Sequence, residues 1–85
     1  MNEFIPPQPP RSFRVVLDLS KAAKRLDVVL LAALRDQKEN LNLHTISRVA
    51  FKKLFTEGRV LIKGQRATVS SGVAKGITYI DILGY

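Results

Sequence analysis

Four polar residues near the middle of the chain have the types and spacing of an anion-binding site. Ser47 and Arg48 stand together, Lys52 follows four residues after Arg48, and Arg59 comes directly after Gly58. In a helix that begins at Ser47, Arg48 and Lys52 lie on one face. The exposed amides and the dipole at such a helix N-terminus attract phosphate as well. The chemistry expected here is the binding of phosphate groups.

Catalytic chemistry has little support in the sequence. His44 is the only histidine, it has no evident nucleophile partner, and the acidic residues are scattered. No glycine-rich phosphate loop stands between a strand and a helix. The chain has no cysteine, so thiolate metal sites and disulfides are excluded. We therefore expect a binding module with no catalytic residues, no metal and no cofactor.

Composition points to a polyanionic partner. The 85 residues include 14 Lys and Arg against 7 Asp and Glu, which gives a formal net charge of +7. Such an excess suits nucleic acid or an anionic membrane surface. No window approaches the roughly 20 apolar residues of a membrane span, and the N-terminus has no signal-peptide pattern. One small monomeric domain in the cytoplasm is expected.

The N-terminal part divides into a tail and the first strand. All four prolines fall within residues 1–12, which we interpret as a disordered, proline-rich tail ahead of a domain over residues 13–85. Residues 13–19 alternate and predict a strand that buries Phe13, Val15, Leu17 and Leu19.

Two helices are predicted next. The first begins between Lys21 and Arg25, with Ser20 as a possible cap, and its buried stripe has helical spacing. That stripe consists of Leu26, Val29, Leu30, Ala33 and Leu34. Residues 36–42 predict an irregular loop, with Leu41 and Leu43 packing back on the core. The second helix runs from Ser47 to a glycine stop at Gly58 and buries Ala50, Phe51, Leu54 and Phe55.

Three short strands complete the predicted domain. Residues 59–63 lead through a tight hairpin, at Lys63-Gly64 or Gly64-Gln65, into residues 66–69. A Ser/Gly loop over residues 70–76 precedes a strand at 77–83, with Ile80 and Ile82 on the face opposite Tyr79 and Asp81. The fold class predicted is α+β, with two helices packed on a small, mostly antiparallel sheet.

The residues so placed resemble a known family, the RNA-binding domain named after ribosomal protein S4. The similar segments are Arg25-Leu26-Asp27 with Leu30, Ser47-Arg48, Leu54-Phe55, Gly58-Arg59-Val60, the Lys63-Gly64 hairpin and the turn at residues 73–76. The resemblance covers residues 25–82 and implies a two-helix S4-type motif. It also implies that RNA is held by the second helix and the strand after it.

The resemblance implies a set of RNA-binding residues. They are Arg25, Ser47, Arg48, Lys52 and Arg59, with Lys63 and Arg66 extending the basic strip beside the hairpin. Asp27 is expected to be structural, because its negative charge suits the dipole at the start of the first helix and can orient either Arg25 or a basic residue of the second helix. Phe51 and Phe55 are expected in the core, so few rings remain for stacking on bases. Structured RNA, with ribosomal RNA as the natural class, is the expected partner.

The resemblance is compatible with more than one biological role for the domain. The strand that precedes Arg25 is similar to the arrangement at the N-terminus of large-subunit-type pseudouridine synthases, which implies a targeting domain for a catalytic part of a longer protein. A ribosome-associated heat-shock or rescue-type factor that acts alone is the alternative. A DNA-binding helix-turn-helix is disfavoured, because the connection between the helices is too long for its usual tight turn.

Three features depart from the family pattern. Lys63-Gly64 stands where Asn-Gly is usual, and lysine adopts positive φ less readily. Gly76-Ile77 replaces Gly-Asp, so Ile80 and Ile82 fit the buried positions if one residue is inserted, as in a bulge. The connection over residues 36–46 is longer than in compact members of the family.

Overall fold

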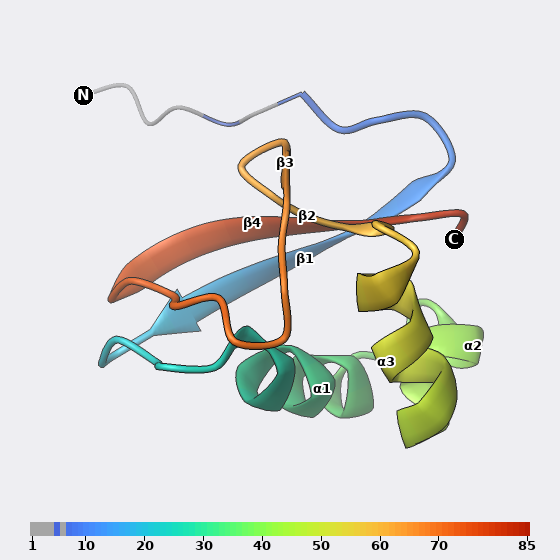
Figure 1. The fold of residues 1–85 in the computed structure, drawn as a ribbon, viewed down its shortest axis with the longest axis horizontal. Helices are drawn as coiled ribbons and strands as arrows, with labels where there is room; N and C mark the ends of the chain where they lie inside the picture. The colour runs from blue at the N-terminus through green and yellow to red at the C-terminus, as the bar shows by residue number, and fades with distance from the viewer. Residues whose placement is uncertain (1–4, 6) are drawn as a thin grey trace.

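The computed structural model describes residue 5 and residues 7–85 of the chain. Its elements are β1 (Ser12–Leu19), α1 (Leu26–Asp36), α2 (Leu41–His44), α3 (Arg48–Thr56), β2 (Val60–Ile62), β3 (Gln65–Arg66) and β4 (Gly76–Leu83). The strands form one sheet in the order β1-β4-β2-β3, and every neighbouring pair is antiparallel. The helices lie against one side of this sheet (Figure 1). The predicted α+β class is confirmed.

Strand β4 is the centre of the sheet and sets its register. It pairs with β1 from Ser12↔Leu83 to Leu19↔Gly76, and with β2 from Val60↔Ile82 to Ile62↔Ile80. Neither ladder skips a residue. The bulge expected in the last strand is therefore absent, and regular alternation alone buries Ile80 and Ile82 completely.

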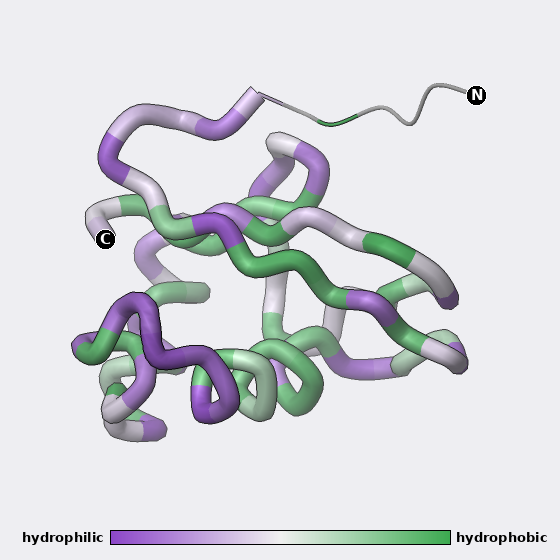
Figure 2. The backbone as a smooth tube through the Cα atoms, turned by 180° about the vertical axis from the view of Figure 1, so that it is seen from behind, coloured by the Kyte–Doolittle hydropathy of each residue, from purple (hydrophilic) through white to green (hydrophobic). Residues whose placement is uncertain are grey.

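The core lies between the sheet and the two longer helices. Helix α1 buries Leu26, Leu30 and Leu34, which recur every four residues along one face. Helix α3 buries Phe51, Leu54 and Phe55 as predicted. The rings of Phe51 and Phe55 meet edge to face, with centroids 5.3 Å apart, so both belong to the core. Figure 2 shows green, hydrophobic segments on the strands and helices that face one another.

The start of α1 differs from the prediction. The helix begins at Leu26, its N-cap is Arg25, and no side chain caps it. The amides of Leu26 and Asp27 instead donate to the carbonyl oxygens of Ser71 and Val69, at 2.8 and 3.3 Å. The segment that follows β3 runs down to this helix end (Figure 1). The prediction of Ser20 as the cap was wrong, because backbone carbonyl groups distant in sequence accept the hydrogen bonds of the first helix amides.

The same segment is tied to the chain ahead of α1. Ala23 and Val73 form an isolated bridge, with reciprocal backbone hydrogen bonds of 2.8 and 2.9 Å. Val73 is buried beneath it. The predicted Ser/Gly loop is thus partly structural, since its one valine enters the core.

The connection between α1 and α3 contains a helical turn that was predicted as an irregular loop. The Asn40 side chain accepts a hydrogen bond of 3.1 Å from the Leu43 amide and starts α2. Leu43 is fully buried as expected, whereas Leu41 is 65% exposed and does not pack on the core. The Asn40 cap stabilises a helical turn, although the composition of the segment favours an irregular loop.

Helix α3 begins and ends as its sequence predicts. The Ser47 Oγ accepts a hydrogen bond from the Ala50 amide at 3.1 Å. At the other end, Gly58 has φ +70°, its amide donates to Phe55 O, and the Arg59 amide donates to Leu54 O. These two bonds form a Schellman motif, which satisfies the last carbonyls of α3 and turns the chain into β2.

We expect Gly58→Ala to lower the free energy of unfolding by about 1–2 kcal/mol, because a Cβ disfavours positive φ. The new Cβ would also lie 3.3 Å from Arg66 Nε. Gly72→Ala is the control, because Gly72 lacks positive φ and its nearest neighbour would lie 3.8 Å away. Urea denaturation measures both. A loss for Gly58→Ala no larger than that for Gly72→Ala would contradict this explanation.

The β2–β3 hairpin turns at Lys63-Gly64, the first of the two predicted positions. Leu61 pairs with Arg66 and Ile62 with Gln65, so the loop has two residues. Lys63 and Gly64 have φ of 51° and 80°, as a type I′ turn requires. Strand β3 has only two residues, shorter than the predicted 66–69, because the chain then leaves the sheet to reach α1.

Part of the predicted tail contacts the sheet. Residues 1–4 and 6 lie outside the described residues, and β1 already begins at Ser12. The Ser12 Oγ donates to Pro9 O at 2.6 Å, the Gln8 side chain donates to Ser12 O at 2.8 Å, and the Gly84 amide donates to Arg11 O at 2.6 Å.

Within the described residues, no helix is long and apolar enough to cross a bilayer.

Candidate nucleic-acid interface

An open groove of about 490 Å³ lies between α1 and α3. The stripe of α1 that faces away from the sheet forms one wall, and the first turns of α3 form the other. The lining residues are Asp27, Val28, Leu31, Ala32, Arg35, Arg48, Phe51 and Lys52. Two of the predicted RNA-binding residues, Arg48 and Lys52, therefore line one groove.

Arg48 and Lys52 stand on the α3 side of this groove and are exposed. Within the part of the chain that the structure describes, neither side chain forms a hydrogen bond or an ion pair. Ser47, just before them, is also exposed, and its oxygen already caps the helix. Helix α3 thus presents two cations that no intramolecular carboxylate neutralises.

Arg25 is linked to the same groove by its ion pair with the lining residue Asp27. The guanidinium donates two hydrogen bonds to the Asp27 carboxylate, at 3.1 and 3.0 Å. The Arg25 side chain is 59% exposed and that of Asp27 is 15% exposed. An ion pair at this exposure contributes little to stability. Its effect is positional, as predicted, since Asp27 holds the cation of Arg25 at one end of the groove.

Arg35 is a groove residue that the sequence reasoning missed. Its Nη1 and Nη2 donate to His44 O and Ile46 O, at 2.8 and 2.5 Å, and so join the end of α1 to the end of α2. The available signal was its spacing, because Arg35 continues the Val28, Leu31 and Ala32 stripe at i+7.

Arg59 and Arg66 lie at the other end of α3, where they are engaged in structural contacts. Arg59 donates to Leu83 O at 3.0 Å and to the Glu57 carboxylate at 3.3 Å, and its guanidinium lies 5.3 Å from the Tyr85 ring centroid. Arg66 donates to Thr56 O at 2.9 Å and so caps the C-terminus of α3.

The predicted RNA-binding residues consequently form two groups. In the first group, Arg48 and Lys52 line the groove, Ser47 precedes Arg48, and Arg25 is paired with the lining residue Asp27. The second group, Arg59, Lys63 and Arg66, lies beyond the C-terminal end of α3. The nine residues of α3 span about 13 Å at 1.5 Å per residue, which separates the groups. Lys63 is exposed at the tip of the β2–β3 hairpin, and this hairpin lies on the side of the sheet away from the helices (Figure 1).

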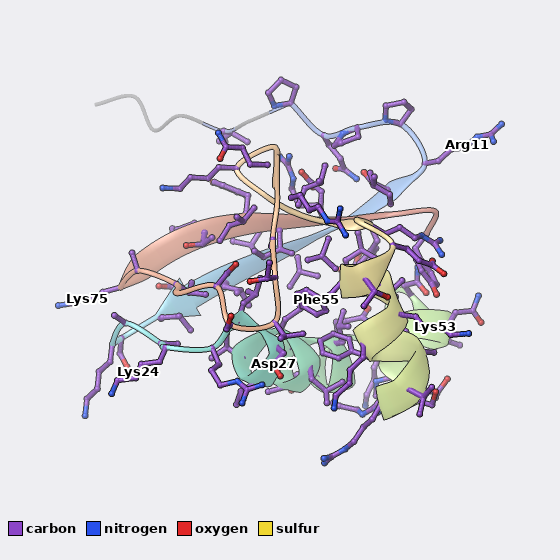
Figure 3. The ribbon with its side chains drawn as sticks, viewed as in Figure 1. Arg11, Lys24, Asp27, Lys53, Phe55 and Lys75 are labelled. Carbon is purple, nitrogen blue, oxygen red and sulfur yellow. The ribbon has the colours of Figure 1, made fainter. Side chains whose placement is uncertain are left out.

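Three further lysines point away from the groove. Figure 3 shows Lys24 and Lys75 at one end of the sheet, and Lys53 on the side of α3 turned away from α1. Lys53 is exposed like Lys52 and is its neighbour in the chain, yet it does not line the groove. It is therefore a matched control for Lys52.

A second unpredicted feature is an ion pair on the sheet face opposite the helices. Arg14 donates to both oxygens of Asp81, at 2.8 and 2.9 Å, and its guanidinium lies 5.3 Å from the Tyr79 ring centroid. The side chains are 13% and 2% exposed. Hydrogen bonding to Asp81, aided by its charge, raises the pKa of Arg14 despite partial desolvation. Arg14 is thus a structural cation.

No protein-family model matches the chain, and no match was found among curated proteins or solved structures. The groove, its cations and the sequence motif are therefore the features that indicate a function.

Proposed function

We propose that this domain binds structured RNA, of the ribosomal class, through the α1–α3 groove. The observation that carries the proposal is the pair of exposed cations, Arg48 and Lys52, on one wall of that groove without intramolecular partners among the described residues. Arg25 adds a further cation beside the groove, where it is paired with the lining residue Asp27. Several convergent cations of this kind bind a phosphate backbone.

The S4-type motif supports the same assignment. Its two halves, Arg25-Leu26-Asp27 and Ser47-Arg48, are far apart in sequence, yet Asp27 and Arg48 line one groove. A motif whose parts converge on a single surface is easier to explain by a common ligand than by independent solvated charges. Membership of the S4-type family is part of this proposal.

The geometry favours RNA recognised by its backbone and shape. Phe51 and Phe55 are buried, so neither is available to stack on a base. Residues 37–47 between α1 and α3 include α2, which makes a tight helix-turn-helix corner impossible. Lys63 at the hairpin tip remains a predicted contact for a longer RNA, as do Arg59 and Arg66 through the donors that their structural bonds leave free.

The proposal is tested by replacing neighbouring lysines. Lys52→Ala should weaken binding to a ribosomal RNA hairpin about threefold and lower the slope of log affinity against log salt by about 1. Arg48→Ala/Lys52→Ala should weaken binding about tenfold or more. Fluorescence anisotropy over a series of salt concentrations measures both quantities.

Lys53→Ala is the matched control and should change affinity and slope much less. If Lys52→Ala and Lys53→Ala were equivalent, the excess positive charge alone would account for binding, and the groove would not be the site. Duplex DNA of the same length serves as competitor and should displace the RNA poorly.

The position of β1 in the sheet is relevant to the kind of protein in which such a domain would occur. Strand β1 pairs with β4 over eight residues, so the strand ahead of the S4-type motif is an integral part of the sheet. This agrees with the arrangement implied by the resemblance to pseudouridine synthases, and we propose a targeting role for the domain in such an enzyme. Co-sedimentation with stalled large ribosomal subunits, but not with intact ribosomes, would favour the rescue-factor alternative instead.

A further inference from the structure

Helix α1 carries more apolar surface than its packing on the sheet requires. Seven consecutive residues, 28–34, are apolar. Leu30 and Leu34 face the core, whereas Val28 is 62% exposed and Ala32 is also exposed. A surface helix normally has polar residues on its outer face. Figure 2 shows this helix as green over most of its length, with purple at its C-terminal end.

This surplus apolar surface is the floor of the α1–α3 groove. Val28, Leu31 and Ala32 of α1 meet Phe51 of α3 there. The cations of Arg48 and Lys52 stand beside the floor, and the Asp27 carboxylate stands at its end. A site for phosphate alone would need neither an apolar floor nor an acid.

A single nucleotide contains a chemical match for each of these parts. Its phosphate suits the two cations, the face of its base is apolar, and the base edge carries N–H donors that a carboxylate accepts. Each Asp27 oxygen accepts one bond from Arg25 and keeps a further lone pair for such a donor. The groove volume of about 490 Å³ lies within the roughly 300–1,000 Å³ of small-molecule sites.

We propose that the groove takes one unpaired nucleotide of the bound RNA, with its base on the Val28–Ala32 floor and its phosphate against Arg48 and Lys52. The inference rests on the proposed function and narrows it to RNA with a bulged or looped-out residue. Unpaired bases are the part of a structured RNA that can leave the stack and enter a protein site.

Two other occupants fit less well. A second copy of the chain would bring a net charge of +7 against an equal charge. An acidic amphipathic peptide would match the cations and the floor, but its carboxylates would meet Asp27 at the groove end. The acid among the cations is what favours a base over a peptide.

The test compares two RNA hairpins that differ by one extra unpaired nucleotide, in wild type, Val28→Asn and Val49→Asn. Val49 is 72% exposed on α3 and does not line the groove, so the two variants make the same chemical change once inside the proposed site and once outside it. Wild type and Val49→Asn should prefer the bulged hairpin by roughly tenfold. Val28→Asn should lose most of that preference.

Ala32→Leu provides a second variant that keeps the groove apolar but fills it. It should also remove the preference for the bulge, because the base would meet the larger side chain. Thermal melting by circular dichroism verifies that all variants are folded, which the exposure of Val28, Ala32 and Val49 leads us to expect.

The outcomes separate this inference from the proposed function. If wild type bound the two hairpins with equal affinity, the inference would be overturned and RNA binding would stand. A preference for the bulged hairpin that survived in Val28→Asn and Ala32→Leu would have the same meaning. Failure to bind either hairpin would refute the proposed function first, and the inference with it. A helical Glu/Leu peptide that binds wild type but not Val28→Asn, without any bulge preference, would identify a peptide as the occupant and overturn the inference.

Discussion

Leu30→Ala is expected to lower the free energy of unfolding by about 2–5 kcal/mol, the usual cost of truncating a fully buried leucine. Leu30 has no exposed surface and stands midway along α1, between Leu26 and Leu34. Leu30 belongs to the buried core cluster, and Val29 and Ala33 of the same helix pack against that cluster, so its truncation leaves a cavity inside the packed side of α1. Urea denaturation followed by circular dichroism measures the loss.

Val28→Ala is the control, because it shortens an apolar side chain of the same helix that is 62% exposed. Its effect should stay within about 0.5 kcal/mol. Similar losses for the two variants would show that α1 is not packed through the Leu30 face, and would also remove the basis for assigning Val28 to an open groove.

Asp81→Asn is expected to lower the melting temperature by about 10 °C, since it breaks a nearly dry ion pair while preserving side-chain shape. The Asp81 side chain is 2% exposed and accepts both hydrogen bonds from Arg14. Asparagine cannot balance the charge of Arg14. The raised pKa of Arg14 keeps its guanidinium protonated as the pH rises, so deprotonation of Arg14 breaks the ion pair only in strong base.

The double variant Arg14→Met/Asp81→Leu tests this explanation. Replacing both partners with apolar residues removes the unpaired charge and should recover most of the lost stability. A double variant that melts as low as Asp81→Asn would show that packing around Asp81, and not the loss of its charge, causes the effect. Thermal melts at neutral pH are sufficient for the comparison.

Local chemistry made much of the fold predictable from sequence. The cap at Ser47, the glycine stop at Gly58 and the alternation in β1 and β4 act over a few residues, and the structure contains all of them. The face of α3 that carries Arg48 and Lys52 follows from the same local periodicity. The wall contributed by α1 was harder to foresee, because Val28, Leu31 and Ala32 lie outside the predicted buried stripe and carry no charge that would mark a binding surface.

The missed features depend on contacts between distant residues. Asp81 has the alternation of a solvent-facing residue, and its burial follows from the register that places Arg14 opposite it. Arg66 has the appearance of a nucleic-acid contact until the hairpin brings it to the last carbonyls of α3. Likewise, the cap of α1 comes from Ser71 and Val69, more than 40 residues away. The local propensities of these residues do not predict contacts between positions so far apart in the sequence.

The position of β4 in the sheet also determines when the domain can form during synthesis. β4 is the last strand of the domain in sequence and the only partner of β1 among the described strands, and the Arg14–Asp81 pair closes a separation of 67 residues. β1 must therefore wait until β4 has left the ribosomal exit tunnel. Helices α1 and α3 can form earlier, but the core closes in one late, non-local step, which makes folding slower than in a helical domain of this size.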